Sequence, residues 1–163
     1  MTEIPRTTRK QLGFLVQDLH ASQLGYYLVK NLNELCVERP DIEPIVFFDR
    51  VAPYCKTPQF ACMNMAEAWG YNGIVIATSA LLANILVNMP CPRVKYLYAW
   101  DLDWLRGQNR PYALFNKLFH EPSLKLIARS QNHIDIIRND FNIKVKDIMD
   151  DFNWRQLLPI LGI

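Results

Sequence analysis

Glycine is scarce in this sequence, and the glycine motif that binds dinucleotides is missing. Only six of the 163 residues are glycine. After the first apolar run, Gly13 and Gly25 stand too far apart to form Gly-x-Gly-x-x-Gly. That motif brings the backbone close to a pyrophosphate at the start of a helix. The sequence therefore disfavours a dinucleotide-binding domain of the dehydrogenase type.

Neither one sign of charge nor a long apolar run dominates the chain. Eighteen Lys and Arg face sixteen Asp and Glu, the formal net charge is +2, and the basic residues are scattered. Nucleic-acid-binding domains usually concentrate their basic residues, so we expect no strong affinity for nucleic acid. The longest apolar stretch, residues 73–89, is interrupted by Thr78, Ser79 and Asn84. It is shorter than the roughly 20 apolar residues of a membrane-spanning helix.

Cysteine and histidine are few and have no metal-ligand spacing. They are Cys36, Cys55, Cys62, Cys91, His20, His120 and His133, with no Cys-x-x-Cys pair. The sequence thus predicts no metal site. The first ten residues lack the apolar segment of a signal peptide. We therefore expect a cytoplasmic protein with reduced thiols, most of them buried as small apolar side chains.

What the sequence does contain is a regular alternation of short apolar runs and amphipathic stretches. With 50% hydrophobic and 21% charged residues, this pattern predicts a single three-layer α/β/α domain with a mainly parallel sheet of about six or seven strands. Strands are expected at 12–17, 44–48, 60–63, 73–77, 94–99, 124–128 and 145–149, and helices after Ser22, Ser79 and Ser130 and over 112–119. We place the domain at 1–151, followed by an apolar tail, 152–163, that packs on the domain or on a partner.

A candidate site follows from this predicted sheet. In open parallel sheets, ligands bind beyond the carboxyl ends of the strands. The residues that follow the predicted strands are Asp18, His20, Ser22, Asp49, Arg50, Thr78, Ser79, Trp100, Asp101, Asp103, Arg129, Ser130 and Asp150. They supply carboxylates, an imidazole, guanidinium groups and an aromatic ring.

Asp18 and His20 allow two interpretations. Either side chain could take a proton from a hydroxyl nucleophile. Alternatively, Asp18 and Ser22 cap the following helix, and His20 is an exposed turn residue.

Asp101 and Asp103 form the short Asp-x-Asp pattern. Two such carboxylates can hold a divalent cation against a nucleotide diphosphate, which would make the chain a metal-dependent sugar transferase. The alternative is a strand-end loop that Trp100 or Trp104 anchors, with both aspartates solvated or capping a helix.

Arg129 and Ser130 also have two interpretations. The guanidinium and the helix dipole could bind an anion. Capping of the next helix by Ser130 explains the same residues.

Taken in order, these segments resemble the N-terminal domain of GT-B glycosyltransferases. Residues 13–35 are similar to that family's first strand, glycine-containing loop and long helix, and residues 96–102 to its strand that ends in a His-Asp pair. Residues 124–148 are similar to its last strand, helix and strand. The resemblance covers roughly Leu12 to Asp151 and implies a Rossmann-like, acceptor-side domain. Trp100 stands where many retaining members have histidine, and the paired glycines of the first loop are reduced to Gly25.

The resemblance implies hexosyl transfer from a nucleotide sugar to a hydroxyl acceptor, if the chain is active, without a metal or another cofactor. The candidate catalytic residues are Asp18, His20 and Asp101, and the candidate substrate-binding residues are Ser22, Gly25, Trp100, Asp103, Arg129 and Ser130. The family's donor-binding half has no counterpart in this sequence. We therefore expect the acceptor-side half of a split or shortened enzyme, either inactive alone or completed by a partner chain. The competing hypothesis is a non-catalytic interaction module whose apolar tail covers the cleft side or forms a homodimer contact.

Overall fold

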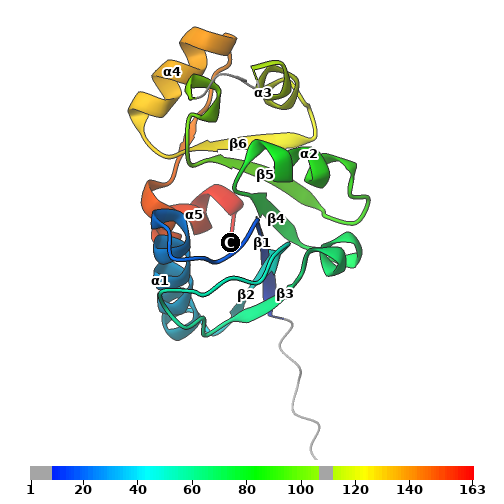
Figure 1. Ribbon diagram of the computed structural model, residues 1–163, viewed down its shortest axis with the longest axis vertical. Helices are drawn as coiled ribbons and strands as arrows, with labels where there is room; N and C mark the ends of the chain where they lie inside the picture. The colour runs from blue at the N-terminus through cyan, green and yellow to red at the C-terminus, as the bar shows by residue number, and fades with distance from the viewer. Residues whose placement is uncertain (1–8, 107–111) are drawn as a thin grey trace, which may run out of the picture.

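Seven parallel strands form one sheet in the computed structural model (Figure 1), which describes residues 9–106 and 112–163. The strand order is β3-β2-β1-β4-β5-β6-β7. The chain thus builds the sheet outward from β1 to β3, returns to place β4 beside β1, and then continues in the other direction. This is the Rossmann-like α/β domain that the sequence pattern predicts.

The regular elements agree with most of the predicted ranges. The strands are β1 (Lys10–Val16), β2 (Ile42–Phe48), β3 (Ala61–Asn64), β4 (Ile74–Ala77), β5 (Val94–Ala99), β6 (Leu124–Ala128) and β7 (Asp147–Ile148). The α-helices are α1 (Gln23–Glu38), α2 (Ala80–Asn88), α3 (Tyr112–Phe119), α4 (Gln131–Phe141) and α5 (Trp154–Leu161). Three short 3₁₀ helices are η1 (Met65–Gly70), η2 (Asp103–Leu105) and η3 (Asp150–Phe152).

The two faces of the sheet have separate apolar cores. Side chains alternate between the faces of a strand, so Leu12, Phe14 and Val16 of β1 pack with α1 and α5, whereas Leu15 packs on the opposite face. That opposite face is covered by α2, α3 and α4. Figure 1 shows α1 and α5 next to each other on one side of the sheet.

Serine caps mark the starts of three helices, as the sequence predicts. The hydroxyl of Ser22 accepts a hydrogen bond from the backbone N–H of Gly25 at 3.0 Å, and Ser79 and Ser130 cap α2 and α4 in the same way. Each cap satisfies a backbone donor that has no partner inside the helix. The helices therefore begin where the sequence places them.

The predicted tail forms helix α5 and packs back onto the sheet. Trp154, Leu157 and Leu158 are buried. The hydroxyl of Tyr98 donates to the carbonyl oxygen of Met149 at 2.6 Å, just before this segment. The main apolar side chains of the tail are thus covered by the chain's own sheet.

The expectation that most cysteines are buried is wrong. Cys55, Cys62 and Cys91 are exposed, and Cys36 is half-buried. Three of them lie in loops or on the edge strand β3, where no layer of helices covers them.

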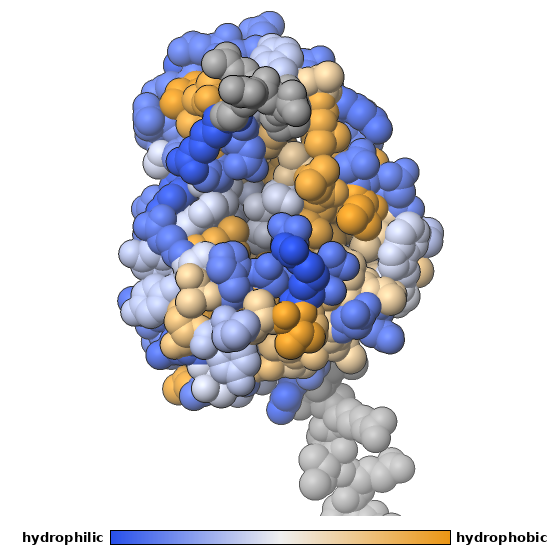
Figure 2. All heavy atoms as spheres, viewed as in Figure 1, coloured by the Kyte–Doolittle hydropathy of each residue, from blue (hydrophilic) through white to orange (hydrophobic). Residues whose placement is uncertain are grey.

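The exposed surface also carries apolar side chains on α2. Leu81 and Ile85 are exposed there, and Figure 2 shows apolar residues gathered over this helix. Within residues 9–106 and 112–163, none of the helices combines the length and the apolar composition needed to cross a bilayer.

Candidate functional site

The carboxyl ends of the strands lie along one edge of the sheet, here called the carboxyl edge. The strand order reverses between β1 and β4, and in such sheets this is the usual place for a ligand. The hydroxyl groups of Thr78 and Ser79, which follow β4, form hydrogen bonds within the domain. Buried Thr78 donates to the carbonyl oxygen of Leu15 at 2.9 Å, and Ser79 caps α2. The exposed polar groups at this point come from the loop after β1.

Asp18 and His20 lie in that loop, and Arg50 reaches Asp18 from the loop after β2. Nδ1 of His20 contacts Oδ1 of Asp18, and the His20 backbone N–H donates to the same oxygen at 3.2 Å. The Arg50 guanidinium donates to Oδ2 of Asp18 at 3.3 Å. Because a carboxylate only accepts hydrogen bonds, Nδ1 carries the proton and Nε2 is left as an acceptor. The side chain of His20 is 58% exposed and that of Asp18 is 13% exposed, so the imidazole faces solvent on a largely buried carboxylate.

These contacts keep the carboxyl group of Asp18 ionised. Burial raises the pKa of Asp18. The hydrogen bonds from His20 and the positive charges of His20 and Arg50 lower it, and together they outweigh the effect of burial. The net pKa lies below the ordinary value of 3.8. At neutral pH the carboxylate can therefore orient the imidazole.

Gly25 holds this loop close to the first turn of α1. A Cβ atom at Gly25 would lie 2.5 Å from the carbonyl oxygen of His20, a distance that real side chains do not reach. Ser22 caps the helix as predicted, whereas Asp18 contacts His20 and Arg50. Gly25 and Ser22 therefore position the loop that carries the Asp18–His20 pair.

Two predicted site residues, Trp100 and Arg129, come together after β5 and β6 with two residues that were not predicted, Asp151 and Phe152. We call these four residues the Arg129 cluster. The Arg129 guanidinium carbon lies 3.9 Å from the centre of the Trp100 ring. Nε and Nη2 of Arg129 donate to Oδ1 of Asp151 at 3.0 and 2.7 Å. Phe152 stacks on Trp100 with 5.2 Å between the ring centres. Trp100 is buried, so its ring leaves little exposed surface for a sugar.

The backbone of the Arg129 cluster is held in an unusual conformation. Asp151 and Phe152 have φ angles of 45° and 60°, in the left-handed region that costs a non-glycine residue about 1–2 kcal/mol. Two interactions offset this cost. The first is the ion pair of Asp151 with Arg129, and the second is the burial of Phe152 against Phe14, Tyr98 and Trp100. Sequence analysis missed Asp151, because nothing in a run of two aspartates signals a left-handed turn.

Asp101 of the Asp-x-Asp pattern forms its hydrogen bonds with residues of the same loop. Asp101 accepts from Arg106 at 2.6 Å and from the backbone N–H of Leu102 at 2.8 Å. Asp103 begins η2, and burial together with the charge of Asp101 raises its pKa. Buried Trp104 donates to Asp140 at 2.7 Å. The geometry therefore favours the loop anchored by tryptophan, and the described residues contain no group of three or more His, Cys, Asp or Glu that could hold a metal ion.

Ser130 and His133 form a contact at the start of α4. The Ser130 hydroxyl accepts from the His133 backbone N–H at 3.3 Å and lies 2.8 Å from His133 Nδ1. A neutral Nδ1 accepts the Ser130 proton in this arrangement. Burial lowers the pKa of His133, and the nearby charge of Arg129 lowers it further.

We expect His133 to titrate below the ordinary value of 6.5. The unfolded chain then binds a proton more readily than the folded chain. The stability that neutral His133 contributes is present above pH 6.5 and is lost as the pH falls through the folded pKa. A nuclear magnetic resonance titration of the imidazole measures this midpoint. A midpoint at or above 6.5 would contradict the assignment.

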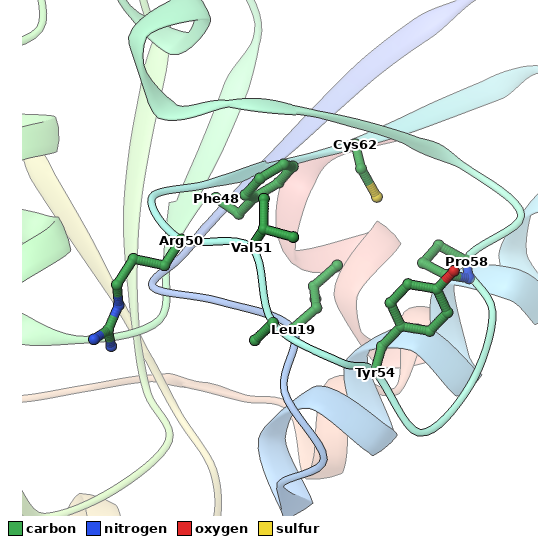
Figure 3. Close-up of a pocket in the computed structure, with 8 residues that line it drawn as sticks. Leu19, Phe48, Arg50, Val51, Tyr54, Pro58 and Cys62 are labelled. Atoms are coloured by element: carbon green, nitrogen blue, oxygen red, sulfur yellow. The ribbon is translucent and has the colours of Figure 1, made fainter.

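A small apolar pocket lies between the loops after β1 and β2 and was not predicted from the sequence (Figure 3). Its volume is about 150 Å³. It forms where the loop after β2 folds back over Leu19. The lining residues are Leu19, Phe48, Arg50, Val51, Ala52, Tyr54, Pro58 and Cys62, and we call this cavity the Leu19 pocket. The sequence predicts only a loop rich in proline and tyrosine for residues 49–58.

The carboxyl edge thus carries the exposed Asp18–His20 pair and the internally bonded Arg129 cluster, and the Leu19 pocket lies between the loops after β1 and β2. The chain was also compared with protein families, with curated proteins and with solved structures. No family model, no curated protein and no solved structure matches it.

Proposed function

We propose that this chain is the acceptor-side unit of a GT-B-like glycosyltransferase, in which the Asp18–His20 pair accepts the proton of the acceptor hydroxyl. One observation carries the proposal. An exposed imidazole is held by a largely buried, ionised carboxylate at the reversal point of a parallel sheet. The fold and the resemblance of residues 12–151 to the N-terminal domain of that family support the same function.

The proposed reaction uses a nucleotide sugar as the glycosyl donor. The acceptor oxygen forms a bond to the anomeric carbon of the donor, while the bond from that carbon to the diphosphate oxygen breaks. The acceptor proton moves to Nε2 of His20, and the electron pair of the broken bond leaves with the nucleoside diphosphate. Asp18 keeps Nδ1 protonated and stabilises the positive charge that forms on the imidazole.

In this proposal, a second protein unit binds the nucleotide sugar donor. The Arg129 guanidinium is paired with Asp151, and the Asp101 carboxylate is paired with Arg106, so these groups already have partners. A nucleotide diphosphate needs several positioned donors. We therefore assign donor binding to a partner chain or domain, and we assign hydroxyl-acceptor binding to this chain.

The test is a transfer assay with a panel of nucleotide sugars and hydroxyl acceptors. Nucleoside diphosphate release is measured with the chain alone and with the product of the neighbouring reading frame. We expect release that depends on this chain and on the acceptor together. If the chain adds nothing to the rate with any donor, a glycosyl-transfer role is excluded for these donors.

A further inference from the structure

β3 is the edge strand of the sheet at the end opposite β7 (Figure 1). Its inner side pairs with β2, from Ala61 beside Ile45 to Asn64 beside Phe48. Among the described residues, no strand pairs with its outer side, and all four of its residues are exposed. The backbone N–H and C=O groups on the outer side are therefore available to a further strand.

This edge lacks the features that usually keep an edge strand from pairing with another chain. Such features include a charged side chain or a proline in the strand, whereas β3 reads Ala-Cys-Met-Asn. Apolar surface accompanies the free edge. Met63 of β3 is 42% exposed, and Trp69 of η1, which directly follows the strand, is 46% exposed. A second strand on this edge would remove some of this apolar surface from water.

The charges on either side of β3 favour a second copy of this chain as the occupant. Between Val51 and Pro92, the only charged residues are Lys56 and Glu67, and both are exposed. Lys56 precedes the strand and Glu67 follows it. In an antiparallel pair, the amino end of each strand lies beside the carboxyl end of the other, which brings Lys56 of each copy toward Glu67 of the other. Parallel pairing would bring like charges together.

One register of the antiparallel pair satisfies both the charges and the apolar side chains. Its two-fold axis passes between Ala61 and Cys62, midway along the chain between the two charged residues. Phe60 of each copy then lies opposite Met63 of the other. Side chains that lie directly opposite each other share a face and interact, and a thioether beside an aromatic ring is a favourable contact.

We propose that two copies of this chain associate through β3, by antiparallel pairing about a two-fold axis, into one continuous sheet. Because β3 has only four residues, we expect a weak dimer with a Kd on the order of 10–100 μM. The carboxyl edges of the two copies then point in opposite directions, so each Asp18–His20 pair stays open to solvent. The dimer does not rest on the proposed function.

Sedimentation equilibrium of the whole chain at low salt measures this Kd. Lys56→Glu and Glu67→Lys should each raise it about tenfold, because each variant turns two attractive charge pairs into repulsive ones. An equimolar mixture of the two variants should restore a Kd within about threefold of the original, because every changed charge then meets its opposite on the other chain. Lys117→Glu makes the same charge change on α3, far along the chain from β3, and should leave the Kd unchanged.

A second measurement uses the unaltered chain. A bismaleimide with a short spacer joins exposed thiols, and mass spectrometry of the digested product identifies the joined cysteines. Cys62 lies beside the proposed axis, so links between two Cys62 residues should be about tenfold more frequent than links between two Cys91 residues. Both cysteines are exposed, so Cys91 reports the background of random collisions.

Three results would overturn the proposal. The first is a monomer at every concentration up to about 1 mM, well above the expected Kd. The second is association that the charge reversals do not weaken or that mixing the variants does not restore, which would assign the contact to another surface, such as exposed Leu81 and Ile85 of α2. The third is equal cross-linking at Cys62 and Cys91.

Discussion

Replacing Phe152 with alanine is expected to lower the free energy of unfolding by about 3–5 kcal/mol. Phe152 is 1% exposed and contacts the rings of Phe14, Tyr98 and Trp100. Truncation leaves a cavity in the face covered by α1 and α5. It also removes the burial that offsets the left-handed backbone at this residue, so the turn carrying Asp151 loses support.

Urea denaturation followed by circular dichroism measures this loss. Phe60→Ala is the matched control, because Phe60 is only half-buried beside the edge strand β3. We expect the control to lose less than half as much stability, with the same dependence on urea concentration. Equal losses in the two variants would mean that Phe152 has no special role.

Replacing His20 with alanine is expected to lower acceptor-dependent glycosyl transfer by about 10²–10⁴-fold, the usual contribution of a positioned general base. Asp18→Asn should act in the same direction. An amide can donate a hydrogen bond to Nδ1, which favours the imidazole form with its proton on Nε2. In that form Nε2 cannot take the acceptor proton. The rate of nucleoside diphosphate release, measured with saturating acceptor, reports both effects.

His120 provides the control for this experiment. It is exposed just beyond the end of α3, and its Nδ1 lies 2.8 Å from the carbonyl oxygen of Asn116, so His120→Ala should leave the transfer rate unchanged. The side chain of His20 is mostly exposed, and its removal should not shift the unfolding midpoint. If the chain supports transfer and both histidine variants transfer at the same rate, His20 is not the base.

Most of the fold could be predicted because buried parallel strands appear in the sequence as short apolar runs. The predicted strands 94–99 and 124–128 agree with β5 and β6 at both ends, since each is an apolar run with polar residues or prolines close by. The start of β2 could not be predicted. The expected strand begins at Pro44, whereas β2 begins two residues earlier, at Ile42, and contains the proline. β3 pairs with β2 only from Ile45 onward, so β2 is an edge at Pro44, and an edge tolerates a residue without an N–H.

The candidate site was predictable in position but not in contacts. The rule for carboxyl ends of parallel strands correctly brings Asp18, His20 and Arg50 to one edge. The rule does not predict that Arg129 forms an ion pair with Asp151. This pair depends on the left-handed backbone at Asp151, 22 residues further along the chain. The Leu19 pocket was equally hidden, because the loop that closes it has no periodicity. Tertiary packing determines both the Arg129–Asp151 ion pair and the shape of the Leu19 pocket.

The position of α5 has a consequence for the order in which the chain becomes folded during synthesis. Tyr96 bonds to a carbonyl oxygen 64 residues later, in α5. At about 5–20 residues per second, roughly 3–13 s pass between the synthesis of these two residues. Until then, one side of β5 displays Tyr96 and Tyr98 without their final cover. A nascent chain in this state has an exposed apolar sheet face, so chaperone binding or aggregation competes with completion of the domain until its last helix arrives.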